Sequence, residues 1–139
     1  MIVVDTNVFS ETLRSAPDEK VMRWLAANAD EIMTTAITVS ELRFGALRLP
    51  EGQRRSEILA AVDALVGMAG ARVVAFDSAA AAHSAALQAR REAVGRVVSV
   101  EDTMIAAICL AGNHVLATRN VRDFDDSGVE LINPWDEAL

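Results

Sequence analysis

Short apolar runs alternate along this chain with longer segments of helical periodicity, and this alternation restricts the possible folds more than any other feature. The first run, Ile2-Val3-Val4, is β-branched and wholly apolar, as strands buried in parallel sheets are. Similar runs occupy residues 32–35, 72–76, 114–118 and 129–132. Strands that alternate with helices form a parallel sheet with helices on both faces. We therefore expect an α/β protein with a single domain over residues 1–139.

Helices are expected between these runs because apolar residues recur there at helical spacing. Asp18 is a favourable cap for a helix that carries Val21 and Trp24 on one face. Two further helix starts have the form of capping boxes, Thr38-x-x-Glu41 and Ser99-x-x-Asp102. The helices predicted from these patterns cover residues 38–49, 55–69, 78–94 and 99–111.

The composition fits a compact protein of the cytoplasm. The chain is 52% hydrophobic and 24% charged, and it has no apolar run near the roughly 18 residues of a membrane span. Its first residues lack the basic flank and apolar stretch of a secretion signal. The single Cys109 excludes an internal disulfide and suits a reducing compartment, with core packing as its expected role. We therefore expect a cytoplasmic protein that makes no membrane contact.

The charge balance by itself argues against nucleic acid as a partner. A formal net charge of −7 repels polyanions at long range. Arginine nevertheless supplies nearly all of the positive charge, since Lys20 is the only lysine, and the planar arginine fork is the better match for phosphate. Arg43, Arg119 and Arg122 lie nearest the expected site, whereas most other arginines, Arg91 among them, are expected on solvated helix faces.

Acidic residues follow the predicted strands at the points where parallel sheets bind their ligands. Asp5 ends the first strand, Glu41 lies in the first turn after the second strand, and Asp102 lies in the first turn of the helix at 99–111. Asn120 and Asp123 come just beyond the fourth strand. Ligands bind beyond the carboxyl ends of parallel strands, so these side chains are expected at one edge. Carboxylates that converge there repel one another, and Mg²⁺ or Mn²⁺ relieves that repulsion.

Each acid also has a purely structural interpretation. Asp5 suits a helix cap, and Glu41 and Asp102 occupy the acidic positions of the two capping-box motifs. Three acids at the same edge of one sheet favour metal binding, because caps have no need to converge. Glu101 is a rival to Asp102, but a neighbouring residue on a helix points about 100° away.

Other kinds of site fit the sequence less well. His83 and His114 are too few and too far apart for a metal pair, and the chain has no P-loop, G-x-G-x-x-G or G-x-S-x-G motif. A phosphate-accepting receiver needs a lysine near its late strands, and Lys20 is in the wrong place. An aspartyl phosphatase needs a second Asp two residues after Asp5, where this chain has Asn7.

Four motifs occur in order along the chain: Asp5-Thr6-Asn7-Val8, Ser40-Glu41-Leu42-Arg43-Phe44-Gly45, Glu101-Asp102-Thr103-Met104-Ile105-Ala106-Ala107, and Ala117-Thr118-Arg119-Asn120-Val121-Arg122-Asp123-Phe124. Asn133-Pro134-Trp135 follows near the end of the chain. Together these segments resemble the PIN-domain ribonucleases, and more narrowly the VapC-type toxins of bacterial toxin–antitoxin pairs. The resemblance spans the whole chain.

The resemblance implies a PIN-like sheet with strand order 3-2-1-4-5 and a metal site formed by Asp5, Glu41 and Asp102. The fourth acidic position is open, because Asn120 stands where many relatives carry an Asp, and Asp123 follows three residues later. Three carboxylates would hold one Mg²⁺ or Mn²⁺ tightly, with a second arriving on the substrate. The implied reaction is hydrolysis of an RNA phosphodiester by a metal-activated water.

The resemblance also implies partners. Such toxins form homodimers and larger assemblies with a small antitoxin that lies across the active edge, and operator DNA is contacted through the antitoxin. That arrangement is compatible with the negative charge of this chain. Two alternatives use the same fold: a non-catalytic binding module, suggested by the neutral Asn120, and a nuclease that cuts DNA, since phosphodiester hydrolysis does not require the 2′-hydroxyl.

Overall fold

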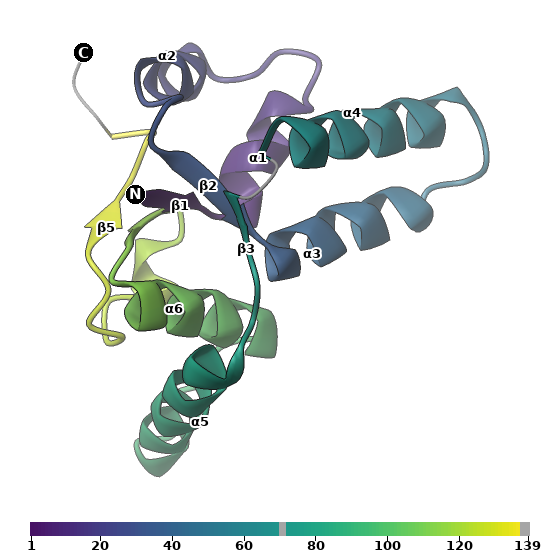
Figure 1. Ribbon diagram of the computed structural model, residues 1–139. Helices are drawn as coiled ribbons and strands as arrows, with labels where there is room; N and C mark the ends of the chain where they lie inside the picture. Colours follow the sequence, from purple (N-terminus) through teal and green to yellow (C-terminus); the bar gives the residue numbers. More distant parts are fainter. Residues whose placement is uncertain (70–71, 137–139) are drawn as a thin grey trace.

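The computed structural model describes residues 1–69 and 72–136, and a five-stranded sheet runs through the middle of this part of the chain (Figure 1). The strand order is β3-β2-β1-β4-β5, and all four pairings are parallel. The strands are β1 (Ile2–Val4), β2 (Ile32–Thr35), β3 (Val73–Val74), β4 (Val115–Ala117) and β5 (Leu131–Ile132). The predicted α/β fold and its strand order are confirmed.

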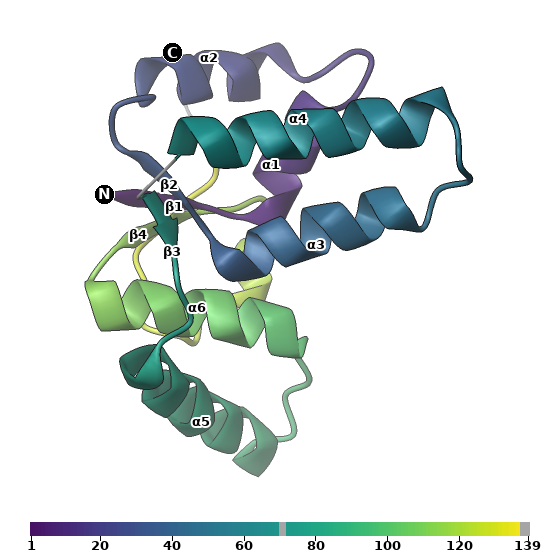
Figure 2. The same cartoon turned by 45° about the vertical axis from the view of Figure 1, so that its right-hand side comes forward.

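Helices cover both faces of this sheet, as the alternating pattern predicts. α1, α2 and α4 lie on one side and α5 and α6 on the other (Figure 2). The helices are α1 (Thr6–Thr12), α2 (Glu19–Ala27), α3 (Ala36–Leu47), α4 (Gln53–Ala69), α5 (Ser78–Ala93) and α6 (Val100–Gly112), with a short 3-10 helix η2 (Val121–Asp123) after β4. Among the described residues, no helix is both long and apolar enough to cross a membrane.

The central strand β1 divides the core into two layers because successive side chains of a strand point to opposite faces. Ile2 and Val4 belong to a cluster that includes residues of α1, α2, α3 and α4. Val3 belongs to a second cluster formed with residues of α5, α6 and β4. Both faces of the strand are therefore buried, which explains why its sequence is uniformly apolar.

The start of α3 differs from the prediction. The helix begins at Ala36, and its cap is Thr35, whose Oγ1 accepts a hydrogen bond from the backbone N of Thr38 at 3.0 Å. The predicted capping box beginning at Thr38 is therefore wrong, because the extended residue at the end of β2 already caps the helix. Glu41 consequently lies in the second turn, with no capping function. At α6 the prediction is confirmed: Ser99 is the cap, and its Oγ accepts from the backbone N of Asp102 at 3.1 Å.

β1 and β2 match the apolar runs that predict them, whereas β3, β4 and β5 are shorter than theirs. The run at 72–76 contributes only Val73–Val74 to the sheet, and the run at 129–132 contributes only Leu131–Ile132. These two strands form the edges, where each has a single neighbour. Cys109 is buried in α6 and packs in the core, as expected.

Candidate active site

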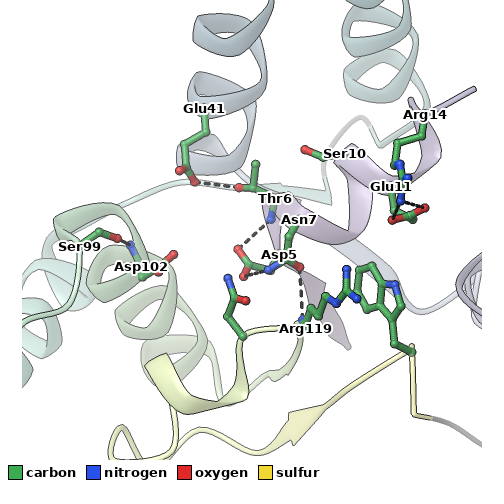
Figure 3. A pocket seen from close by; sticks show the side chains of 12 residues that line it. Asp5, Thr6, Asn7, Ser10, Glu11, Arg14, Glu41, Ser99, Asp102 and Arg119 are labelled. Atoms are coloured by element: carbon green, nitrogen blue, oxygen red, sulfur yellow. Dashed lines mark hydrogen bonds and ion pairs between the residues drawn. The ribbon is translucent and has the colours of Figure 1, made fainter. Parts of the chain in front are cut away.

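A cavity of about 590 Å³ lies at the carboxyl end of the sheet, where α1 and α6 begin (Figure 3). Its position is the one expected for a ligand site in a parallel sheet. Its walls combine side chains from five separate segments of the chain. They are Asp5, Thr6, Asn7, Ser10, Glu11, Arg14, Glu41, Ser99, Asp102, Arg119, Asn120 and Trp135.

Asp5 lies at the centre of this cavity, directly after β1. Its backbone N donates to the carbonyl of Ala117 at 2.9 Å, so the sheet ladder extends to this residue. Its Oδ1 accepts from the backbone N of Thr6 at 2.8 Å and caps α1, while its Oδ2 accepts from Thr118 Oγ1 at 2.8 Å. The side chain is almost wholly buried, and burial raises its pKa although these hydrogen bonds oppose the rise. Asp5 is therefore a cap and a desolvated carboxylate at once.

Glu41 approaches Asp5 from α3. Its Oε1 accepts a hydrogen bond from Thr6 Oγ1 at 2.7 Å, so the first turn of α1 orients this carboxylate. Partial burial is the main cause that raises its pKa, and the charge of Asp5 adds to the effect. The structure places it in the same cavity as Asp5, although the helix that carries it begins earlier than expected.

Asp102 lies on the same side of Asp5 as Glu41, in the first turn of α6 (Figure 3). Burial, followed by the charges of Asp5, Asp123 and Glu41, raises its pKa to about 6. Burial is the larger cause of this rise, and the charges of the neighbouring acids add to it. The neighbouring Glu101 is exposed and does not line the cavity, whereas Asp102 does; the role of Asp102 as a metal ligand stays a prediction.

The two candidates for the fourth position occupy different places. Asn120 lines the cavity, and its backbone N donates to Thr118 Oγ1 at 3.0 Å. Asp123 ends η2 and is not among the lining residues, but its charge raises the pKa of both Asp5 and Asp102. Asn120 therefore offers a neutral oxygen inside the cavity, whereas Asp123 contributes a negative charge from its edge.

The oxygen-rich walls suit a hard divalent cation, but they do not form a closed cage. Within residues 1–69 and 72–136, no three His, Cys, Asp or Glu side chains are arranged to hold a metal ion directly. Mg²⁺ needs no such cage, because it is commonly bound by one or two carboxylates and keeps water or substrate phosphate as its other ligands. The crowded acids with raised pKa values therefore fit a partly hydrated Mg²⁺ or Mn²⁺, and three direct protein ligands remain a prediction.

Several lining residues escaped the sequence reasoning. Ser10 and Arg14 follow Thr6 at intervals of four residues, so one stripe along α1 and its end borders the cavity. Glu11 is buried and accepts hydrogen bonds from Arg14 Nη1 at 3.2 Å and from the backbone N of Asp18 at 2.9 Å. For Ser10 and Arg14, the spacing of four residues from Thr6 was the sequence signal that could have identified them. Trp135 belongs to the Asn133-Pro134-Trp135 segment that carries the family resemblance, but its place at the cavity was not predicted.

Of the three arginines expected at the site, only Arg119 lines the cavity. Arg43 forms an ion pair with Asp63 on α4 instead. Arg122 is exposed on η2 and does not line the cavity. Proximity in sequence to the acids was therefore a poor guide to the basic residues, because helix direction carries these two side chains elsewhere.

Thr6 and Thr118, the two hydroxyl residues beside the acids, bind the acids themselves. Thr6 donates to Glu41 and Thr118 donates to Asp5. Asn7 Nδ2 also approaches Asp5 Oδ2, at 3.3 Å. The acids are thus held by side chains from α1 and the end of β4, which fixes their orientation.

Comparison with known proteins agrees with this architecture. The PIN domain model matches residues 2–128. The VapC ribonuclease Y4jK of Sinorhizobium fredii is 40% identical over 99% of this chain and 100% of its own length. The crystal structure of FitAcB from Neisseria gonorrhoeae superposes with a TM-score of 0.91 at 32% identity, covering 99% of this chain and 100% of that one.

A more distant structure has the same fold. VapBC-5 from Mycobacterium tuberculosis, described as a member of the VapBC family of toxin–antitoxin systems, superposes with a TM-score of 0.69 at 28% identity, covering 94% of this chain and 96% of that one. The domain model, the near full-length relative and the ordered acids lead to the same conclusion. The chain belongs to the PIN domain family and, within it, to the VapC-type toxins.

Proposed function

We propose that this protein is a metal-dependent endoribonuclease that hydrolyses RNA phosphodiester bonds. The observation that carries the proposal is the convergence of Asp5, Glu41 and Asp102 in one cavity, each with a raised pKa. Carboxylates that crowd together are unfavourable for folding, so their persistence in a cleft favours a functional role. The ribonuclease name of the S. fredii relative supports RNA as the substrate.

The side chains have distinct roles in this reaction. Asp5 and Asp102 would hold Mg²⁺ or Mn²⁺, which when bound lowers the pKa of water and stabilises charge on the phosphate oxygens. Glu41, which is oriented by its hydrogen bond from Thr6, would orient the attacking water. Asp102 is the alternative residue for this role. Asn120 and Asp123 would complete the ligand sphere through a neutral oxygen and a nearby charge.

We also propose that the protein works in the cytoplasm as the toxic half of a toxin–antitoxin pair. The name of the VapBC-5 structure, which describes a toxin–antitoxin family, supports a cognate antitoxin as the partner. We expect a homodimer that joins the antitoxin in a larger assembly, with operator DNA bound only through the antitoxin. The net charge of −7 favours that division, since this chain repels DNA at long range.

The test is cleavage of labelled RNA and of labelled DNA of the same sequence, with Mg²⁺ and with a chelator. RNA should be cut only with the metal, and Asp5→Asn and Glu41→Gln should each reduce the rate by about 100-fold or more, which is the loss of several kcal/mol of transition-state stabilisation. In Asp5→Asn, the asparagine keeps a side-chain oxygen that caps α1, so this variant should still fold. Glu101→Gln, beside Asp102 but outside the cavity, is the matched control and should cut at the parental rate.

A second candidate is a binding module of the same fold without catalysis. The neutral Asn120 and the open ligand arrangement favour it. Under this hypothesis RNA is bound but not cut, and a chelator changes nothing. Cleavage of the DNA strand at a rate equal to that of RNA would instead establish a nuclease that does not read the 2′-hydroxyl.

A further inference from the structure

The candidate active site has an arginine side as well as an acidic side. In Figure 3, Glu41 and Asp102 lie to one side of Asp5, and Arg14 lies to the other, with Arg119 below. The guanidinium carbon of Arg119 lies 4.9 Å from the centre of the Trp135 ring. This distance is that of a cation–π stack, which orients a guanidinium without neutralising it.

Both members of the stack are anchored from behind. The backbone N of Arg119 donates to Asn7 Oδ1 at 3.3 Å, next to the hydrogen bond between Asn7 and Asp5. The backbone N of Trp135 donates to Asn133 Oδ1 at 3.0 Å, and its ring packs against the core cluster that contains Ile2 and Val4. The stack is therefore tied to the same strand end that positions Asp5.

Arg119 differs from Arg14, the other arginine that lines the cavity, in what its charge faces. Arg14, Arg43, Arg91 and Arg96 all form ion pairs with carboxylates. Arg119 has no carboxylate within 4.0 Å anywhere in residues 1–69 and 72–136, although four acids line the same cavity. The Trp135 ring covers one face of the guanidinium, and its hydrogen-bond donors remain available to another anion.

We propose that Arg119, held flat by Trp135, binds a backbone phosphate of a single-stranded RNA next to the phosphate that is hydrolysed. This inference rests on the proposed function and identifies a part of the site that binds the RNA substrate. The arginine fork matches two phosphate oxygens. A strand that crosses the cavity from the acids to Arg119 would place one phosphate at each end. Arg119 is then a binding residue, and Trp135 is a positioning residue that acts through it.

The first experiment measures RNA binding without cleavage. The full chain carrying Asp5→Asn is titrated into a short labelled single-stranded RNA, and Kd is read from fluorescence anisotropy at several salt concentrations. Arg119→Gln should weaken binding about tenfold and should lower the slope of log K against log salt by about 0.7, the value for one phosphate contact to a single strand. Arg122→Gln removes the same charge from η2, outside the cavity, and should leave the slope unchanged.

Two results would overturn the phosphate contact. One is an equal effect of Arg119→Gln and Arg122→Gln, which would reduce Arg119 to a contribution of net charge. The other is weaker binding by Arg119→Gln with an unchanged salt slope, which would mean that the guanidinium touches no phosphate. Neither result depends on cleavage, so failure of this inference is distinguishable from failure of the proposed nuclease activity.

The second experiment tests whether Trp135 acts through Arg119. In the parental background, Trp135→Leu should raise KM for RNA about as much as Arg119→Gln does, with a smaller change in kcat, because the acids are untouched. Trp135→Phe keeps an aromatic face and should restore most of the parental KM. Combining Trp135→Leu with Arg119→Gln should add little to either change alone. Additive losses, or a Phe variant no better than Leu, would show that Trp135 serves only the core.

Discussion

Two groups of charged side chains meet at the first turns of α6, and their electrostatics are opposite. In the candidate active site, Asp5, Glu41 and Asp102 crowd together, and each has a raised pKa. Nearby, the buried guanidinium of Arg91 binds both oxygens of Asp126, with Nε to Oδ2 at 3.1 Å and Nη2 to Oδ1 at 2.9 Å. These contacts lower the pKa of Asp126. Among the described residues, the acids of the first group have no cationic partner, whereas Arg91 and Asp126 form an ion pair. We call them the unpaired and the paired group.

The difference separates a cluster that we propose binds a ligand from one that holds the fold together. Arg91 also donates to Thr103 Oγ1 at 2.9 Å and to the carbonyl of Asp123 at 2.7 Å. It thereby joins α5 to the residue after Asp102 and to the end of η2. Carboxylates left to repel one another weaken the folded state, which is why we propose a ligand of opposite charge for this cavity.

The largest effect on stability is expected from breaking the paired group. Arg91→Ala should lower the free energy of unfolding by about 3 kcal/mol, because it removes the bidentate partner of Asp126 and leaves the carbonyl of Asp123 without its donor. Urea denaturation followed by circular dichroism measures this change. Arg43→Ala breaks the exposed pair with Asp63 and is the control, with an expected loss below about 1 kcal/mol. Equal losses would mean that burial of Arg91 contributes nothing.

In the unpaired group, removing a charge is expected to raise the free energy of unfolding. Asp102→Asn should stabilise the metal-free protein by about 1 kcal/mol, a value reduced for solvent screening because the side chain is only half buried. Thermal unfolding should show a rise in Tm of about 3 °C. Mg²⁺ should stabilise the parent and not the variant, by mass action. A destabilised variant would instead favour the capping interpretation of this residue.

Lowering the pH should reduce the repulsion among the carboxylates of the unpaired group. The pKa of Asp102 is raised to about 6 in the folded state, above its unfolded value, so the folded state binds more protons between about pH 4 and 6. The cost of the ionised group is fully present above pH 6 and is relieved as pH falls through this window. The stability difference between Asp102→Asn and the parent should therefore shrink as pH falls from about 7 to about 4. A difference independent of pH would contradict the assignment to ionisation of Asp102.

The smallest effect is expected from adding a charge to the unpaired group. Asn120→Asp introduces the carboxylate of the family pattern into an exposed position of the cavity. It should lower the stability of the metal-free protein by about 0.5 kcal/mol and should strengthen Mg²⁺ binding in calorimetry. The mirror substitution Asp123→Asn should weaken Mg²⁺ binding if Asp123 fills the fourth position. An unchanged affinity in both variants would remove both residues from the ligand sphere.

The two groups also differ in how far the sequence predicts them. Asp5 and Asp102 were recognisable because each follows a strand or a helix cap whose local pattern is clear. Arg91 was expected on a solvated face and is instead 3% exposed. Its partner Asp126 lies 35 residues away, and no local spacing connects the two. The same limit applies to the stack of Arg119 on Trp135.

The sequence by itself determined the alternation of strands and helices, the parallel sheet and the acids at its edge, because hydrophobic period and helix capping act over a few residues. The tertiary structure decided that Thr35 caps α3 in place of Thr38, that Thr6 orients Glu41, and that Trp135 returns to Arg119. The contacts of Thr6 with Glu41 and of Arg119 with Trp135 join residues that are distant in sequence. Packing of the whole chain selects these partners from many possible ones. Local patterns therefore located the acids, and long-range packing determined what surrounds them.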